Sequence, residues 1–202
     1  MDLVKTVIRR DSWDADKRLA EMQLVREPLL ECRDVAISEA ANATAFHPAN
    51  AAGTFSYHHG TWALRDRFVG EDWVECRADG IETIRNDKLK IKIAYCNVDV
   101  ACDAEHPKPR SKKGAGAERA CGGLFGDLPQ YAPRPTGDYA LYYLMVDGDG
   151  AVELTRPVLQ GGTFTGAVER IFLSFGKDDD EAVIADDKTG PVDNFDPQVV
   201  RK

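Results

Sequence analysis

The stretch WVECRADGIETIRNDKLKIKIAYC, residues 73–96, decides the fold class of this chain. It contains three short runs with strand character, at residues 73–77, 81–85 and 89–96, and in the last run apolar residues alternate with lysines. Ala-Asp-Gly and Asn-Asp-Lys separate the runs, and both tripeptides favour turns. The pattern therefore predicts a three-stranded antiparallel meander.

The residues before the meander have helical composition. Between residues 14 and 43, apolar side chains recur at three- and four-residue spacing, which is typical of a helix with one buried stripe. Pro28 interrupts this pattern, because proline has no amide hydrogen to donate inside a helix. We expect either a kink here or two helices that meet near Glu27.

A further helix is expected over residues 54–69, ended by Gly70. Its spacing puts Tyr57, Leu64 and Phe68 on one side, which we expect to face the core. The helices and the meander would then pack as separate layers.

Strand character returns after residue 137. Residues 139–146, 151–155 and 168–175 are rich in β-branched or aromatic side chains, and Gly-Asp-Gly separates the first two runs. The sequence thus predicts a single α+β domain over residues 1–176. Its core would be a mostly antiparallel sheet of about six strands with the N-terminal helices packed on one face.

The composition bounds the functional class. A net charge of -8 argues against sequence-independent coating of nucleic acid, so any anion site must be local. No run approaches the roughly 20 apolar residues of a membrane span, and acidic residues follow the first ten, so a cytoplasmic protein is expected. An odd number of cysteines predicts reduced thiols, several of them buried; they are Cys32, Cys76, Cys96, Cys102 and Cys121.

Residues 97–137 form the longest segment without a clear pattern. Proline and glycine are frequent there, and only a short helix near residues 116–121 is expected. Loops this long inside a domain are usually functional or partly disordered. The acidic, proline-spaced residues 177–202 are expected to form a tail that adds little to the core.

Positive charge is concentrated in HPKPRSKKGAGAER, residues 106–119. Glycines let backbone N–H groups converge on an anion while basic side chains neutralise it. The spacing matches neither the P-loop nor the dinucleotide fingerprint, and a solvated loop whose cations offset nearby carboxylates is the alternative. The predicted anion- or partner-binding residues are Lys108, Arg110, Lys112, Lys113, Gly114, Gly116 and Arg119.

A zinc site is a weaker interpretation of the same region. Cys96, Cys102, His106 and Cys121 are residue types that a tetrahedral site uses. Five residues separate the first two cysteines, whereas zinc ligands usually come in pairs two to four apart. Buried thiols account better for the pattern, so no metal and no cofactor are predicted.

A metal-dependent nuclease or phosphodiesterase is the enzymatic alternative, with Asp79, Glu82, Asp99 and Lys92 as participants. Such a core needs an acid two residues before a lysine on one strand, and neither Lys90 nor Lys92 has one. No complete catalytic constellation is present, so no catalytic residue is predicted and the sequence favours a non-enzyme.

Four stretches resemble a group of uncharacterised proteins from bacteriophages, prophages and mobile elements. They are GTFSYHHGTWALR from Gly53, NVDVACD from Asn97, SKKGAG from Ser111 and VERIF from Val168, and the resemblance spans roughly residues 50–175. The group has no established activity, so the resemblance implies a setting rather than a chemistry.

The resemblance implies an accessory protein with a counter-defence role, which binds a host defence complex or a nucleic-acid-associated partner. We expect residues 105–119, here named the basic loop, to be the contact. Two alternatives stay open. Acidic residues along the N-terminal helix and the tail could imitate a phosphate backbone, or the protein could be a virion or assembly component.

Overall fold

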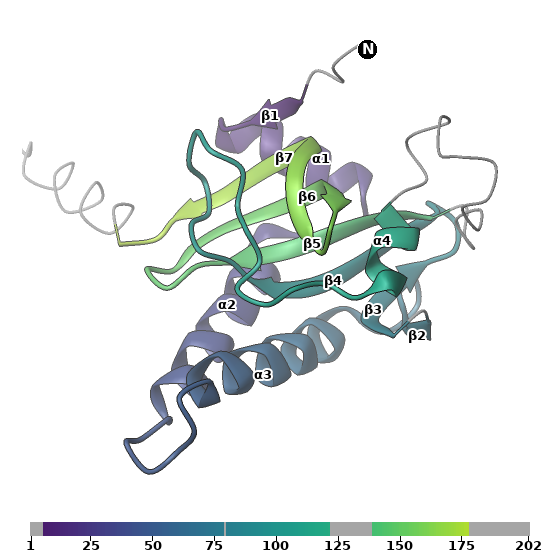
Figure 1. The fold of residues 1–202 in the computed structure, drawn as a ribbon. Coiled ribbons are helices and arrows are strands. Elements are labelled where there is room, and N and C mark those ends of the chain that lie inside the picture. The colour runs from purple at the N-terminus through teal and green to yellow at the C-terminus, as the bar shows by residue number, and fades with distance from the viewer. Residues whose placement is uncertain (1–5, 79, 122–138, 178–202) are drawn as a thin grey trace, which may run out of the picture.

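The structure, a computed structural model, describes residues 6–78, 80–121 and 139–177. Within these ranges, a seven-stranded mixed sheet has the order β1-β7-β6-β5-β4-β3-β2 (Figure 1). The strands are β1 (Val7–Arg9), β2 (Val74–Ala78), β3 (Ile81–Asn86), β4 (Ile91–Asn97), β5 (Ala140–Val146), β6 (Ala151–Gln160) and β7 (Thr163–Phe175). The helices are α1 (Ser12–Glu21), α2 (Arg26–Ala41), α3 (Ala51–Phe68) and α4 (Ala115–Cys121).

The α+β class is confirmed, but the sheet is less antiparallel and one strand larger than predicted. β4 pairs in parallel with β5, and β1 pairs in parallel with β7. Neighbouring parallel strands need a long crossover connection, which the chain between β4 and β5 supplies. Only three residues form β1, too few to show an alternating pattern.

The predicted meander is present as β2, β3 and β4, paired antiparallel. Because side chains alternate along a strand, Ile91, Ile93 and Tyr95 point to one face of the sheet and Lys92 to the other. Asn86 fixes the turn before β4, since its Oδ1 accepts from the backbone N–H groups of Lys88 and Leu89.

The N-terminal helices α1, α2 and α3 pack on one side of the sheet, here named the helix face (Figure 1). α1 ends at Glu21 and α2 begins at Arg26, so two helices meet where Pro28 predicted a break. Pro28 lies in the first turn of α2, where a missing amide hydrogen removes no helical bond. Buried residues of this layer include Leu19, Met22, Leu29, Cys32, Leu64, Ile84, Ile93, Leu144, Leu154 and Ile171.

The opposite side, here named the loop face, is covered by residues 98–114 and by α4 (Figure 1). The long segment that sequence patterns left without structure thus packs against the sheet over its described part, and α4 confirms the expected short helix. The buried residues between this segment and the sheet form a second core, which contains Ala94, Cys96, Val98, Ala101, Cys102, Ala117, Leu141, Tyr143, Met145 and Phe172. The predicted tail, from residue 178 onward, lies outside the described residues.

All five cysteines are free, and four are buried. Among the helices that the structure describes, none has both the length and the apolar character needed to cross a membrane.

Candidate functional site

An ion pair inside the loop face anchors the basic loop. Arg170 on β7 donates through Nη2 to Oε2 of Glu153 on β6 at 2.6 Å, and both side chains are fully buried. Nη1 of Arg170 also donates to the carbonyl oxygens of Asp103 and Glu105, at 2.9 and 3.1 Å. Glu153 in turn accepts from the backbone N–H of Cys102 at 2.7 Å. The buried pair therefore fixes residues 102–105, where the basic loop begins, to the sheet.

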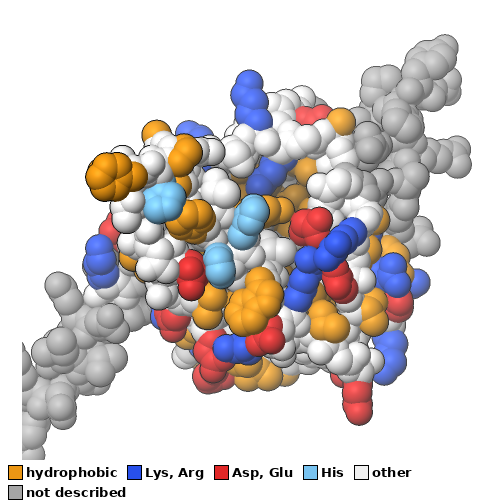
Figure 2. Space-filling view, turned by 90° about the horizontal axis from the view of Figure 1, so that it is seen from below, with side chains coloured by type: hydrophobic (Ala, Val, Ile, Leu, Met, Phe, Trp, Pro, Cys, Tyr) orange, Lys and Arg blue, Asp and Glu red, His pale blue; other side chains and the backbone are white. Residues whose placement is uncertain are grey.

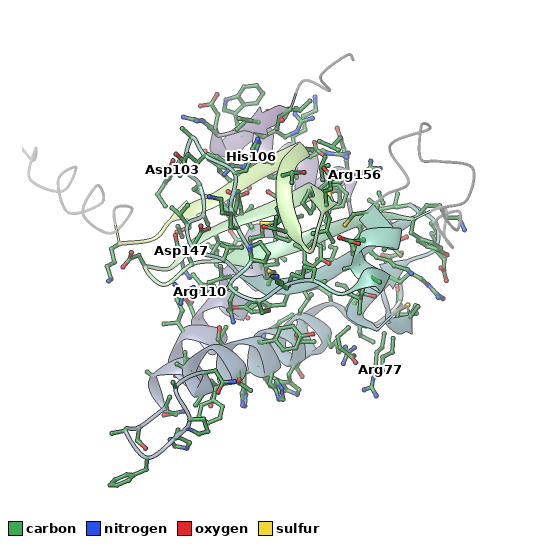
Figure 3. The ribbon with its side chains drawn as sticks, viewed as in Figure 1. Arg77, Asp103, His106, Arg110, Asp147 and Arg156 are labelled. Atoms are coloured by element: carbon green, nitrogen blue, oxygen red, sulfur yellow. The ribbon has the colours of Figure 1, made fainter. Side chains whose placement is uncertain are left out.

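The middle of the loop folds back on the end of β4. Oδ1 of Asp99 accepts from the backbone N–H of Lys108 at 2.7 Å. Arg110 donates from its backbone N–H to Asn97 and from Nε to the carbonyl of Val98, the latter at 2.9 Å. Arg110 consequently lies at the same end of the sheet as the β5–β6 turn, whereas the residues around Asp103 lie farther along the loop (Figure 3).

The end of the loop docks on the turn between β6 and β7. The backbone N–H of Lys113 donates to the carbonyl of Gly162 at 2.9 Å, and the N–H of Gly162 donates to Oε1 of Glu118 at 2.7 Å. The Nζ of Lys113 stands 5.3 Å from the ring centroid of Tyr143, a cation–π contact. Lys113 is thus half-buried and directed at the sheet.

The predicted binding residues form a strip rather than a single cradle. Lys108 and Arg110 lie at the end of β4, and Lys112 and Lys113 lie beside the β6–β7 turn. The side chains of Lys108, Arg110 and Lys112 are exposed, as is Gly114, whereas Gly116 is buried. The side chain of Arg119, in α4, is outside the part of the chain that the structure describes.

The backbone groups of this loop bind elsewhere. The N–H groups of Lys108 and Lys113 donate to acceptors of the protein itself, so they do not converge on an anion. At these two residues, any anion contact must therefore come from the side chains.

Charge pairing distinguishes the strip from most arginines of the described residues. It does not distinguish the strip from every other cation, because Arg10, Arg156, Lys17, Lys90 and Lys92 also lack a carboxylate partner within the described residues. Within the described residues, no carboxylate oxygen lies within 4.0 Å of a side-chain nitrogen of Lys108, Arg110, Lys112 or Lys113. Nine other arginines and two lysines do have such a partner: Arg9, Arg18, Arg26, Arg33, Arg65, Arg67, Arg77, Arg85, Arg170, Lys88 and Lys177.

A second group of cations, which the sequence analysis did not identify as a site, surrounds Tyr139. The guanidinium of Arg85 and the ammonium groups of Lys90 and Lys92 lie 5.8, 4.9 and 5.3 Å from its ring centroid. The Tyr139 hydroxyl donates to Asp87 at 2.5 Å, and this bond, together with Arg85, lowers the pKa of the Asp87 carboxyl.

The proposed zinc ligands do not come together. Cys102 Sγ donates to the carbonyls of Val152 and Ser174, so this thiol is engaged inside the second core. Cys96 is buried beneath Lys113. Among the residues placed by the structure, no three or more potential ligands form a group that could hold a metal ion.

The members of the nuclease hypothesis are also separated. Glu82 pairs with Arg65 of α3 on the helix face, whereas Lys92 lies on the loop face. Asp99 is at the far end of β4, and Asp79 lies outside the described residues.

A different surface is formed by α2 and α3 (Figure 2). Two hollows of about 430 and 550 Å³ share His58 and Trp62 as lining residues. Trp62 is 54% exposed. Charged side chains around it, such as Arg65 and Arg77, pair with neighbouring carboxylates, so this surface carries apolar and ion-paired groups rather than free charge.

The fold and the strip define an α+β protein with helices on one face of a mixed sheet and a basic loop fixed across the other. Compared with known proteins, the chain matches no family model, no curated protein and no solved structure. The resemblance to proteins of phages and mobile elements stays a prediction.

Proposed function

We propose that the protein acts by binding and that its loop face contacts a negatively charged partner. The exposed side chains of Lys108, Arg110 and Lys112 supply the charge, and Lys113 extends it toward Tyr143. The observation that carries the proposal is that these cations have no carboxylate partner among the described residues, whereas most arginines do. Unneutralised cations on one face favour an anionic partner.

The anchoring of the loop supports a binding role. Glu153 and Arg170 hold the loop to the sheet through three backbone contacts, at Cys102, Asp103 and Glu105. Charges displayed on a fixed support lose less conformational entropy on binding than charges on a free chain. The strip is therefore arranged before a partner arrives.

The proposed partner is a nucleic-acid-associated complex or a host defence protein. This part of the proposal rests on the resemblance to proteins of phages and mobile elements and would make the chain a non-enzymatic accessory protein. A partner must overcome the net charge of -8, but charges beyond about 10 Å are largely screened at 0.1 M salt. Contact should thus be local and should weaken with salt.

A matched pair of variants tests the proposal. Lys108→Gln/Lys112→Gln removes two exposed charges without breaking a side-chain contact of the described residues. Lys17→Gln/Lys88→Gln changes the net charge equally, but Lys17 lies on α1 and Lys88 is paired with Asp72. The probe is a fluorescent heparin fragment, and its dissociation constant is measured by anisotropy.

We expect the loop variant to weaken heparin binding at least about fivefold, since one charge contact contributes about 1 kcal/mol in water. The control should bind as the wild type does. Equal affinity of the loop variant and the wild type would remove the loop from the function.

A further inference from the structure

We propose that Arg85, Lys90 and Lys92, gathered around Tyr139, form a second anion-binding position, and that with the basic loop they hold the phosphate backbone of a nucleic-acid strand. This inference rests on the proposed function, because it names the ligand class of the same face. It adds three residues that the loop hypothesis did not contain.

Tyr139 organises positive charge that would otherwise spread apart. The ring attracts three cations within 6 Å of its centroid, which is the geometry of cation–π contacts. Only Asp87 among the described carboxylates pairs with a member of this cluster, through Arg85. Three positive charges and one carboxylate leave a surplus of two, and Lys90 and Lys92 supply it.

This cluster and the end of the basic loop lie on one face of the sheet. Tyr139, Leu141 and Tyr143 alternate onto the loop face, where Leu141 and Tyr143 belong to the second core. Lys92 and Lys113 approach the two tyrosines from the same side. The cations therefore continue the strip along β4 and β5.

The spacing of the two tyrosines suits a chain of anions. Tyr143 is on β5 and Tyr139 directly precedes that strand, so they are four residues apart in extended chain, which corresponds to about 13 Å. One phosphate group cannot contact both positions, but a backbone that carries successive phosphates can. The strip thus fits a polyanion better than a single small anion.

A nucleic acid fits this strip better than an acidic protein does. Protein interfaces depend on a few buried aromatic or aliphatic anchors. The exposed large apolar side chains of the described residues lie elsewhere, on the N-terminal strand, on the helices and the connections next to them, and at the far end of β7. Val74, beside Arg85, is the exception. Lysine ammonium groups recognise phosphates as point charges, without reading bases.

The closing experiment removes the two unpaired lysines. Lys90 has a φ of 55°, so asparagine, which tolerates this region, replaces it. The variant Lys90→Asn/Lys92→Gln is compared with the control Lys17→Gln/Lys88→Gln, which has the same net charge. The probe is a labelled single-stranded DNA of about 12 nucleotides, within the site sizes of sequence-independent binders. Anisotropy is measured over a series of salt concentrations.

Loss of two phosphate contacts should lower the slope of log affinity against log salt by about 1.4 and weaken binding roughly 10- to 30-fold at 0.1 M salt. The control should keep the wild-type slope. Tyr139→Leu, which keeps every charge but removes the ring, should weaken binding several-fold, and thermal unfolding confirms that each variant is folded. If the double variant does not fold, the DNA affinity of the Tyr139→Leu variant alone tests the inference.

The loop variant Lys108→Gln/Lys112→Gln, measured with the same DNA, separates the two proposals. This inference would be overturned, and the proposed function would stand, if the loop variant lost DNA binding while Lys90→Asn/Lys92→Gln kept the wild-type slope of log affinity against log salt. The reverse result would overturn the role of the loop and keep the Tyr139 site. Absence of DNA binding, or tighter binding of polyglutamate than of DNA, would refute the nucleic-acid ligand.

Discussion

Gly60 on α3 lies so close to Tyr95 on β4 that a Cβ at residue 60 would stand 2.5 Å from Cε2 of the tyrosine ring. One turn earlier, the Ser56 hydroxyl bonds with the Tyr95 hydroxyl at 3.0 Å and donates to Oδ1 of Asn97 at 2.7 Å. The small residues of α3 therefore let the helix approach the sheet and satisfy a buried tyrosine.

Gly60→Ala should destabilise the protein, although alanine normally favours a helix by about 1 kcal/mol. The added methyl group has no space beside Tyr95, and overpacking costs about 1–3 kcal/mol. Urea unfolding measures the change. The matched control is Gly53→Ala in the same helix, where nothing lies within 4 Å, and it should be neutral or stabilising. A Gly60→Ala protein as stable as the control would contradict the close approach.

Arg170→Met should cost about 3–5 kcal/mol of unfolding free energy, because it leaves Glu153 charged and buried without a partner. It should also release the loop, since the bonds to the Asp103 and Glu105 carbonyls disappear. Hydrogen exchange of the Cys102 amide reports that release.

Two comparisons sharpen this test. Arg77→Met breaks exposed ion pairs and should change stability by no more than about 1 kcal/mol. The double variant Glu153→Leu/Arg170→Met should recover part of the loss, because no buried charge remains. If the single Arg170 variant is as stable as Arg77→Met, the pair does not anchor the loop.

Glu169 should make stability depend on acidic pH. Burial alone would raise its pKa, but hydrogen bonds from Arg18, Tyr142 and Arg9 outweigh burial and lower it below the usual 4.5. A lowered pKa means that the carboxylate stabilises the fold above its unfolded-state pKa, and that this stability is lost as pH falls through the folded-state pKa.

Glu169→Gln should therefore cost about 1–3 kcal/mol near neutral pH, and the difference from wild type should shrink as the pH drops below about 4.5. Urea unfolding across this range measures it. Glu21→Gln removes the half-exposed partner of Arg18 and should show little of this dependence. A pH-independent difference would mean that Glu169 acts by packing and not by charge.

Local pattern was sufficient for the parts of the fold that repeat locally. Alternation predicted the meander, and Pro28 predicted the junction of α1 and α2. The rest depended on distant partners. β6 continues through Pro157, and β7 contains Gly166. Both residue types normally mark strand ends, so the long hairpin was missed.

The orientation of α3 and the cluster of cations around Tyr139 were also hard to predict, because both depend on residues that are distant in the sequence. The helical stripe of α3 suggested that Tyr57 is buried, yet it is exposed, because the close contact with Tyr95 turns Ser56 and Gly60 inward. The lysines at 90 and 92 resembled the polar side of a strand, and only the fold brings Tyr139 to them. Nothing in the spacing of the basic loop indicated that a buried pair on β6 and β7 would hold it.

The cysteines should react slowly with iodoacetamide near pH 8, in an order set by their exposure. Burial raises the pKa of Cys32, Cys102 and Cys121 from 9.0 to about 12, which lowers the reactive thiolate fraction roughly a thousandfold. Cys121 is the least buried of the five, so it should be alkylated first, as mass spectrometry of digests can show. In guanidinium all five should react at similar rates, because burial is lost. Native labelling of Cys32 or Cys102 as fast as Cys121 would mean that the cores around them open readily.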